Sequence, residues 1–182
     1  MAEQAMGILY YRRHFMLLAC VSAALAASGR WTPAFGAVTA CGLYGALHAS
    51  AVVITLRAPT PVRRKLLFVA GGALLSMLSV TVSLYASRLD ATLPGMAKPA
   101  LLLTLSSGGG GAGYGILIGR LLGADLKPPA LWSISLGCVA ATLAVLASGI
   151  YLRYGGWWFA VAWWFAFSIG LRCHDGRAAR AA

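Results

Sequence analysis

A single histidine inside an apolar stretch is the first candidate for chemistry in this sequence. His48 lies in residues 31–56, which hold no charged side chain. Imidazole can carry a proton or bind a metal, and an ionisable side chain inside a membrane span is a functional candidate. The alternative is a neutral histidine that is hydrogen-bonded to a nearby Ser, Thr or Tyr. His14 and His174 are predicted to lie near the inner face, away from His48, so a metal or haem site is not indicated.

A second candidate is the spacing of small residues in the fourth apolar run. They recur every four positions, at Ser107, Gly111, Gly115, Gly119 and Gly123. Residues four apart share one face of a helix, where small side chains let another helix approach closely. The pattern therefore predicts a tight helix–helix interface, within the chain or between copies. The functional alternative is a weakened helix whose carbonyls, with Ser106, Ser107 and Tyr114, line a path or bind an ion.

The second run has a similar stripe of small residues, at Ala37, Cys41, Gly45 and Ala49. We expect this stripe to be a partner face for the fourth run. Trp163 and Trp164 lie in the last run. They could form an aromatic wall for an apolar or cationic ligand, or simply pack against the glycine-lined helices.

The sequence lacks the residues that several kinds of membrane chemistry need. The only acids are Glu3, Asp90, Asp125 and Asp175, and no Asp, Glu, Lys or Arg lies well inside an apolar run. This disfavours transport coupled to a membrane-buried carboxylate. The four cysteines include no CxxC pair, and the adjacent Cys173-His174-Asp175 is badly placed to relay a proton among its own members. No catalytic residue, cofactor site or metal site is therefore predicted.

Long apolar runs must position these candidates. The 182 residues are 60% hydrophobic and 10% charged, far fewer charges than on a soluble domain. A bilayer core needs ~20 helical residues. The chain is thus predicted to be an all-α integral membrane protein with one polytopic domain over 1–182. The predicted spans are 15–29, 34–56, 66–87, 99–119, 130–152 and 156–171. A signal peptide is the alternative for the first span, with Ala24-Leu25-Ala26 as its cleavage site.

The net charge is +11, and the basic residues flank the runs instead of forming one face. With the amino terminus inside, eleven fall on the inner side: Arg12, Arg13, Arg57, Arg63, Arg64, Lys65, Arg120, Lys127, Arg172, Arg177 and Arg180. Four fall outside: Arg30, Arg88, Lys98 and Arg153. Both termini are therefore predicted to be cytoplasmic, in a bacterial inner membrane with anionic lipids at the inner face. Nucleic-acid binding is not expected.

Three functions from different classes remain open. A channel or transporter component for a small solute is favoured by the glycine-rich run, by His48 and by a weak internal repeat. The repeat lays 33–57 over 129–153 with 7 identities in 25 positions. A non-catalytic subunit of a larger membrane complex, or a homo-oligomer, is favoured by the small-residue stripes. A membrane enzyme is the third alternative, for which the sequence offers no reaction centre.

Overall fold

A computed structural model of the chain describes residues 8–27, 36–89, 97–124, 126–154 and 157–181. Over these residues the fold is helical and contains no β-strand, which confirms the predicted all-α class. The elements are α1 (Tyr11–Ala27), α3 (Ala37–Thr55), α4 (Val62–Leu89), α5 (Ala97–Leu117), the π-helical turn η2 (Ile118–Leu122), α6 (Pro128–Ser148), α7 (Ile150–Tyr154) and α8 (Trp157–Ala181).

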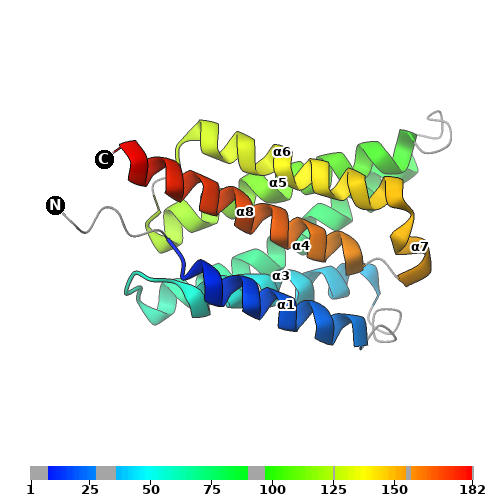
Figure 1. Cartoon of the computed structure of the whole chain (residues 1–182). Coiled ribbons are helices and arrows are strands. Elements are labelled where there is room, and N and C mark those ends of the chain that lie inside the picture. Colours follow the sequence, from blue (N-terminus) through cyan, green and yellow to red (C-terminus); the bar gives the residue numbers. More distant parts are fainter. Residues whose placement is uncertain (1–7, 28–35, 90–96, 125, 155–156, 182) are drawn as a thin grey trace.

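The long helices alternate in direction and pack in chain order around a common axis (Figure 1). Each contacts the next one along the chain, and α8 also contacts α1, which closes the ring. The start of α1 and the end of α8 consequently lie at the same end of the bundle (Figure 1). A ring of this many helices encloses more central space than a compact four-helix bundle. Large side chains have to fill that space.

Among the described residues, four helical stretches are long and apolar enough to cross a membrane: Val38–Thr55, Val62–Thr81, Ala100–Leu122 and Pro128–Ser148. The outer surface suits such an environment, since Leu66, Leu74 and Leu78 of α4 are all at least 60% exposed. Crossings by α1 and α8 stay predictions. α1 has only 17 residues, and α8 carries four tryptophans in its first half and its charged residues after residue 171.

Proline and glycine set the helix ends near the loops. α6 starts at Pro128, where the missing amide hydrogen of proline costs nothing. It ends at Ser148 and is capped by Gly149, whose φ of 65° is left-handed and whose N–H donates to the carbonyl of Leu146. The predicted fifth span, 130–152, thus covers two helices, because α7 starts as a separate short helix after this turn. α8 in turn continues well past residue 171.

The glycine-rich segment does not interrupt its helix. α5 is a continuous α-helix from Ala97 to Leu117 and changes to the π-helical turn only at Ile118. Glycine disfavours a helix in water, but backbone groups in lipid must find partners inside the chain. The helix is therefore not broken at its glycines, and a path lined by its carbonyls stays a prediction.

Candidate functional site

His48 lies at the centre of the ring, enclosed by aromatic side chains. It is fully buried, and the centroids of Tyr114, Trp163, Phe167 and Trp164 lie 5.3, 5.4, 5.6 and 5.8 Å from its own. The planes of the His48 and Trp164 rings are only 8° apart. These residues come from α3, α5 and α8, so the aromatic layer joins three helices that alternate around the ring.

The imidazole of His48 has no polar contact to match its burial. Neither ring nitrogen has a hydrogen-bond partner among the described residues. A buried donor or acceptor left unpaired costs roughly 1–3 kcal/mol. His48 is thus held by ring packing alone, and the hydrogen-bonded neighbour expected for it is not found.

His14, unlike His48, has hydrogen-bonded neighbours at both of its ring nitrogens. Its Nδ1 lies 2.9 Å from Oγ1 of Thr55, and its Nε2 lies 2.8 Å from Oγ of Ser168. The Thr55 hydroxyl donates to the carbonyl of Ala51, so it accepts from His14 Nδ1. His14 therefore joins α1 to α3 and α8. Its ring centroid is 6.3 Å from that of His48, so the expectation that His14 stays apart from His48 is wrong. The cause is that α1 starts at Tyr11 and carries His14 into the interior.

A cavity of about 170 Å³ borders this aromatic layer. Its lining includes Tyr44, Tyr114, Trp163 and Trp164, all of which also contact other rings of the layer or its neighbours. Hydroxyl groups complete the wall: Ser76, Ser79, Ser106, Ser107 and Thr142. None of the lining residues is charged. The interior thus combines aromatic surface with hydroxyl oxygens and no ionised group.

Hydrogen bonds that cross between helices fix this wall. The Tyr114 hydroxyl of α5 donates to the carbonyl of Gly45 on α3, at 2.8 Å. The Trp163 indole of α8 donates to the carbonyl of Ser107, at 3.0 Å. Ser107 in turn lies 2.8 Å from the Thr142 hydroxyl of α6. Tyr114, Trp163 and Ser107 were all candidates from the sequence, and they meet here.

The other two candidates, Gly111 and Gly115, continue the face of α5 that Ser107 turns toward α6. A Cβ added to Gly111 would lie 3.1 Å from the Cα of Ser135, and one added to Gly115 would collide with the side chain of Leu131. Both neighbours belong to α6, so this face forms an interface within the chain. The expected partner for it, the second-run stripe, packs elsewhere. A Cβ at Gly45 would meet Gly72 and Ser76 of α4, because consecutive helices are neighbours in the ring.

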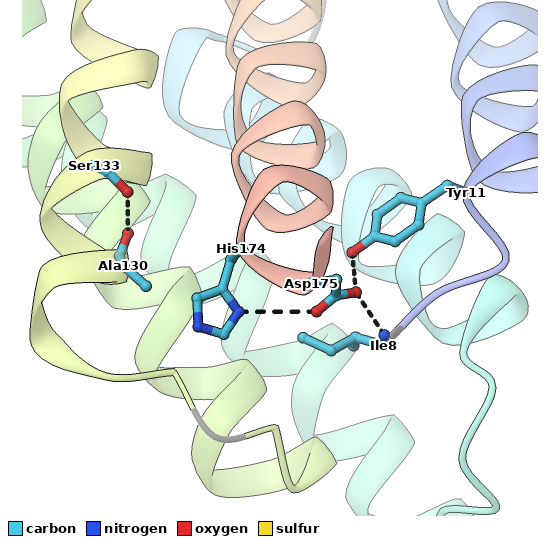
Figure 2. Close-up of polar contacts among 6 residues, drawn as sticks. All are labelled: Ile8, Tyr11, Ala130, Ser133, His174 and Asp175. Atoms are coloured by element: carbon cyan, nitrogen blue, oxygen red, sulfur yellow. Dashed lines mark hydrogen bonds and ion pairs between the residues drawn. The ribbon is translucent and has the colours of Figure 1, made fainter. Parts of the chain in front are cut away.

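At the end of the bundle where the described chain begins and finishes, Asp175 ties α8 to α1. Figure 2 shows its carboxylate between Tyr11 and His174. Oδ2 accepts hydrogen bonds from the Tyr11 hydroxyl, at 2.5 Å, and from the amide of Ile8, at 2.7 Å. Burial, and then this hydrogen bond, raise the pKa of Tyr11 above its ordinary value. Oδ1 is 3.8 Å from His174 Nδ1, too far for a hydrogen bond.

A second hollow, of about 590 Å³, lies between the start of α6 and the end of α8. Lys127, Ser133, Cys173 and His174 contribute its polar groups. Within the described ranges, no three His, Cys, Asp or Glu side chains are grouped as a metal site would require. Although Asp175 is next to His174 in the sequence, Cys173, His174 and Asp175 do not form such a group in the described structure.

Sequence reasoning missed His14, Thr55, Ser168 and Thr142. Each is a polar residue near or within an apolar run, and alone none departs from ordinary composition. One signal could have found three of them. Thr55 and Ser168 both lie near the predicted cytoplasmic ends of their apolar runs, at the same predicted depth in the membrane as His14. Only the ring order shows that these three residues face one another.

No family model, no curated protein and no solved structure matches this chain.

Proposed function

We propose that this chain is a small multi-pass membrane channel or transporter component for a small solute. The observation that carries the proposal is the cavity of about 170 Å³ inside the helix ring. Ligand sites in bundles are built between facing helices from mainly apolar walls with a few placed polar groups. The lining comes from α3, α4, α5, α6 and α8, which is nearly the whole ring.

The order of layers along the axis supports this proposal. On α8 the cavity residue Ala160 is followed by Trp163, Ser168 and Asp175, which span about 22 Å at 1.5 Å per residue. The cavity thus lies in the half away from the two ends of the described chain. The aromatic layer, the His14 hydrogen bonds and the Asp175 contacts follow in turn. A solute in the cavity would be open to one side of the membrane at most, as alternating access requires.

The charge distribution supports an orientation for this path. The positions of the eleven basic residues predicted to be inside all fall at the end of the bundle that carries the start of α1 and the end of α8 (Figure 1). Under the positive-inside rule this end is cytoplasmic. The cavity then lies in the outer half of a bacterial inner membrane, and the basic end lies against anionic head groups.

Purification in mild detergent followed by reconstitution tests the proposal. We expect a particle that contains this chain alone and that accelerates the equilibration of at least one small solute across liposomes, relative to protein-free liposomes. A particle that always contains fixed amounts of other proteins would favour the complex-subunit function. A pure particle with no effect on a broad panel of neutral solutes and ions would contradict the proposal.

A further inference from the structure

Three hydroxyl groups of the cavity wall, those of Ser106, Ser107 and Thr142, have a defined hydrogen-bond direction. Thr142 Oγ1 donates to the carbonyl of Cys138, at 2.8 Å. A hydroxyl has one hydrogen, so Ser107 must be the donor in the Ser107–Thr142 pair. Ser106 donates to the carbonyl of Leu103. The hydrogens of Ser106, Ser107 and Thr142 are therefore all used within the chain.

The same holds for two aromatic groups in the wall. Tyr114 donates its hydroxyl hydrogen to Gly45, and Trp163 donates its indole hydrogen to Ser107. Four oxygens of these five side chains, those of Ser106, Ser107, Tyr114 and Thr142, keep lone pairs. Toward a ligand these four groups can only accept hydrogen bonds.

The volume of the cavity and the absence of charge on its lining residues restrict the class of ligand further. A dry cavity of roughly 150 Å³ holds one benzene molecule. The cavity here, at about 170 Å³, has room for one such ring with one or two small substituents. Its lining residues carry no charge that could pair with an ion. Burying an ion without a counter-charge is costly, so a neutral ligand is favoured.

We propose that this cavity is a binding site for an uncharged ligand of about the size of a substituted benzene ring, with an apolar body and a hydroxyl or amine that donates a hydrogen bond. The assignment rests on the proposed function, since it names the class of solute that the path would take. Stacking on Trp163 and Trp164 would hold the apolar body. The Ser107 and Thr142 oxygens would accept the donated hydrogen.

Two probes of nearly equal size test whether the ligand's hydrogen-bond donor contributes to binding. 4-Fluorophenol and 4-fluorotoluene differ only in a hydroxyl against a methyl group, and both can be followed by ¹⁹F NMR with the full chain in lipid nanodiscs. We expect saturable binding of 4-fluorophenol, with an affinity about two- to tenfold above that of 4-fluorotoluene, as one net hydrogen bond gives. Equal affinities, or a preference for 4-fluorotoluene, would overturn the donor assignment.

Matched variants place the binding in the cavity. Ala160→Leu adds bulk to the cavity wall, whereas Ala140→Leu makes the same change on the exposed side of α6. We expect Ala160→Leu to abolish saturable binding and Ala140→Leu to keep it. Thr142→Val frees the Ser107 hydrogen, so it should lower the ratio of the two affinities. Thr104→Val, outside the cavity lining, should leave the ratio unchanged. Thermal unfolding of each variant checks that it is folded.

The outcomes separate this inference from the proposed function. Absent saturable binding, or equal binding in Ala160→Leu and Ala140→Leu, would overturn the site, even if the protein accelerates flux of other solutes. Saturable binding with the expected pattern in a protein without any flux would support the site and overturn transport as its purpose. Tighter binding of tetramethylammonium than of 4-fluorophenol would overturn the uncharged class.

Discussion

The hydroxyl of Tyr11 donates a hydrogen bond of 2.5 Å to Oδ2 of Asp175, which is 164 residues away. The amide of Ile8 donates to the same oxygen, and Leu9 forms an isolated antiparallel bridge with Leu56. The segment that leads into α1 is thus attached both to the end of α8 and to the end of α3. These contacts close the ring of helices at its basic end.

Removing the Tyr11 hydroxyl should loosen this closure. We expect Tyr11→Phe to lower the free energy of unfolding by about 1–2 kcal/mol, because the partner is a carboxylate and the contact is partly buried. Tyr10→Phe is the control, since Tyr10 is exposed and its ring contact with Arg57 survives the change. Thermal unfolding in detergent compares them. Equal melting temperatures for the two variants would show that the contact does not stabilise the fold.

The same contact predicts an alkaline pH dependence. The raised pKa of Tyr11 means that the fold favours the neutral phenol, whose unfolded pKa is about 10. The stability it contributes is fully present below pH ~10 and is lost as the pH rises above that value. The difference in melting temperature between wild type and Tyr11→Phe should therefore narrow at high pH. A difference that stays constant from pH 8 to 11 would contradict this assignment.

Glycine substitutions on α5 should differ in a set order. Gly111→Leu should be the most damaging, because its new side chain meets the backbone of Ser135. Gly115→Leu meets the flexible end of Leu131 and should cost less, while Gly109→Leu has nothing within 4 Å and should be tolerated. Overpacking typically costs 1–3 kcal/mol, and the Gly111 change should reach about 3 or more. Expression and thermal stability are the readouts; similar values for all three would refute the close approach of α5 and α6.

The same substitution should cost much more stability at His14 than at His48, although both histidines are buried. His14→Leu loses the contacts to Thr55 and Ser168 and leaves polar groups unpaired, so it should destabilise by about 2–4 kcal/mol. His48→Leu removes two ring nitrogens that have no partner, so unfolding should change by less than about 1 kcal/mol. If His48 borders the solute path, its replacement should also change flux or the pH dependence of flux. A larger loss of stability for His48→Leu than for His14→Leu would overturn this ranking.

A topology test addresses the orientation. A reporter that is active only outside the cytoplasm, fused after α8, should be inactive, because eleven basic residues flank the inner end in the predicted arrangement. The same reporter in the loop after α4 should be active. Strong activity of the fusion after α8 would contradict the cytoplasmic assignment of this end.

Apolar run length predicted much of the fold. Charged residues separate the runs, so helices overlapping all six were expected, and the all-helical class is confirmed. Helix ends were less predictable. Gly149 stops α6 inside an uncharged run, and nothing in local hydropathy distinguishes this glycine from those that α5 carries within its helix.

The interior was only half predictable. His48, Tyr114, Trp163 and Trp164 stood out as rare residue types, and they do gather around the centre. The partner of Gly45 and the separation of His14 from His48 were predicted wrongly, because both depend on which helices are adjacent. Ring order is a tertiary property, and the small-residue stripes of α3 and α5 look equally complementary before that order is known.

The most direct measurement of the central claim is solute flux into liposomes with the cavity filled. Wild type, Ala160→Leu and Ala140→Leu would be reconstituted at equal density, and the uptake of 4-fluorophenol and other small neutral solutes followed against protein-free liposomes. A path through the cavity predicts accelerated uptake of at least one solute by wild type and Ala140→Leu, and its loss in Ala160→Leu. Equal uptake by all three proteins, or none above the protein-free rate, would contradict a solute path through this cavity.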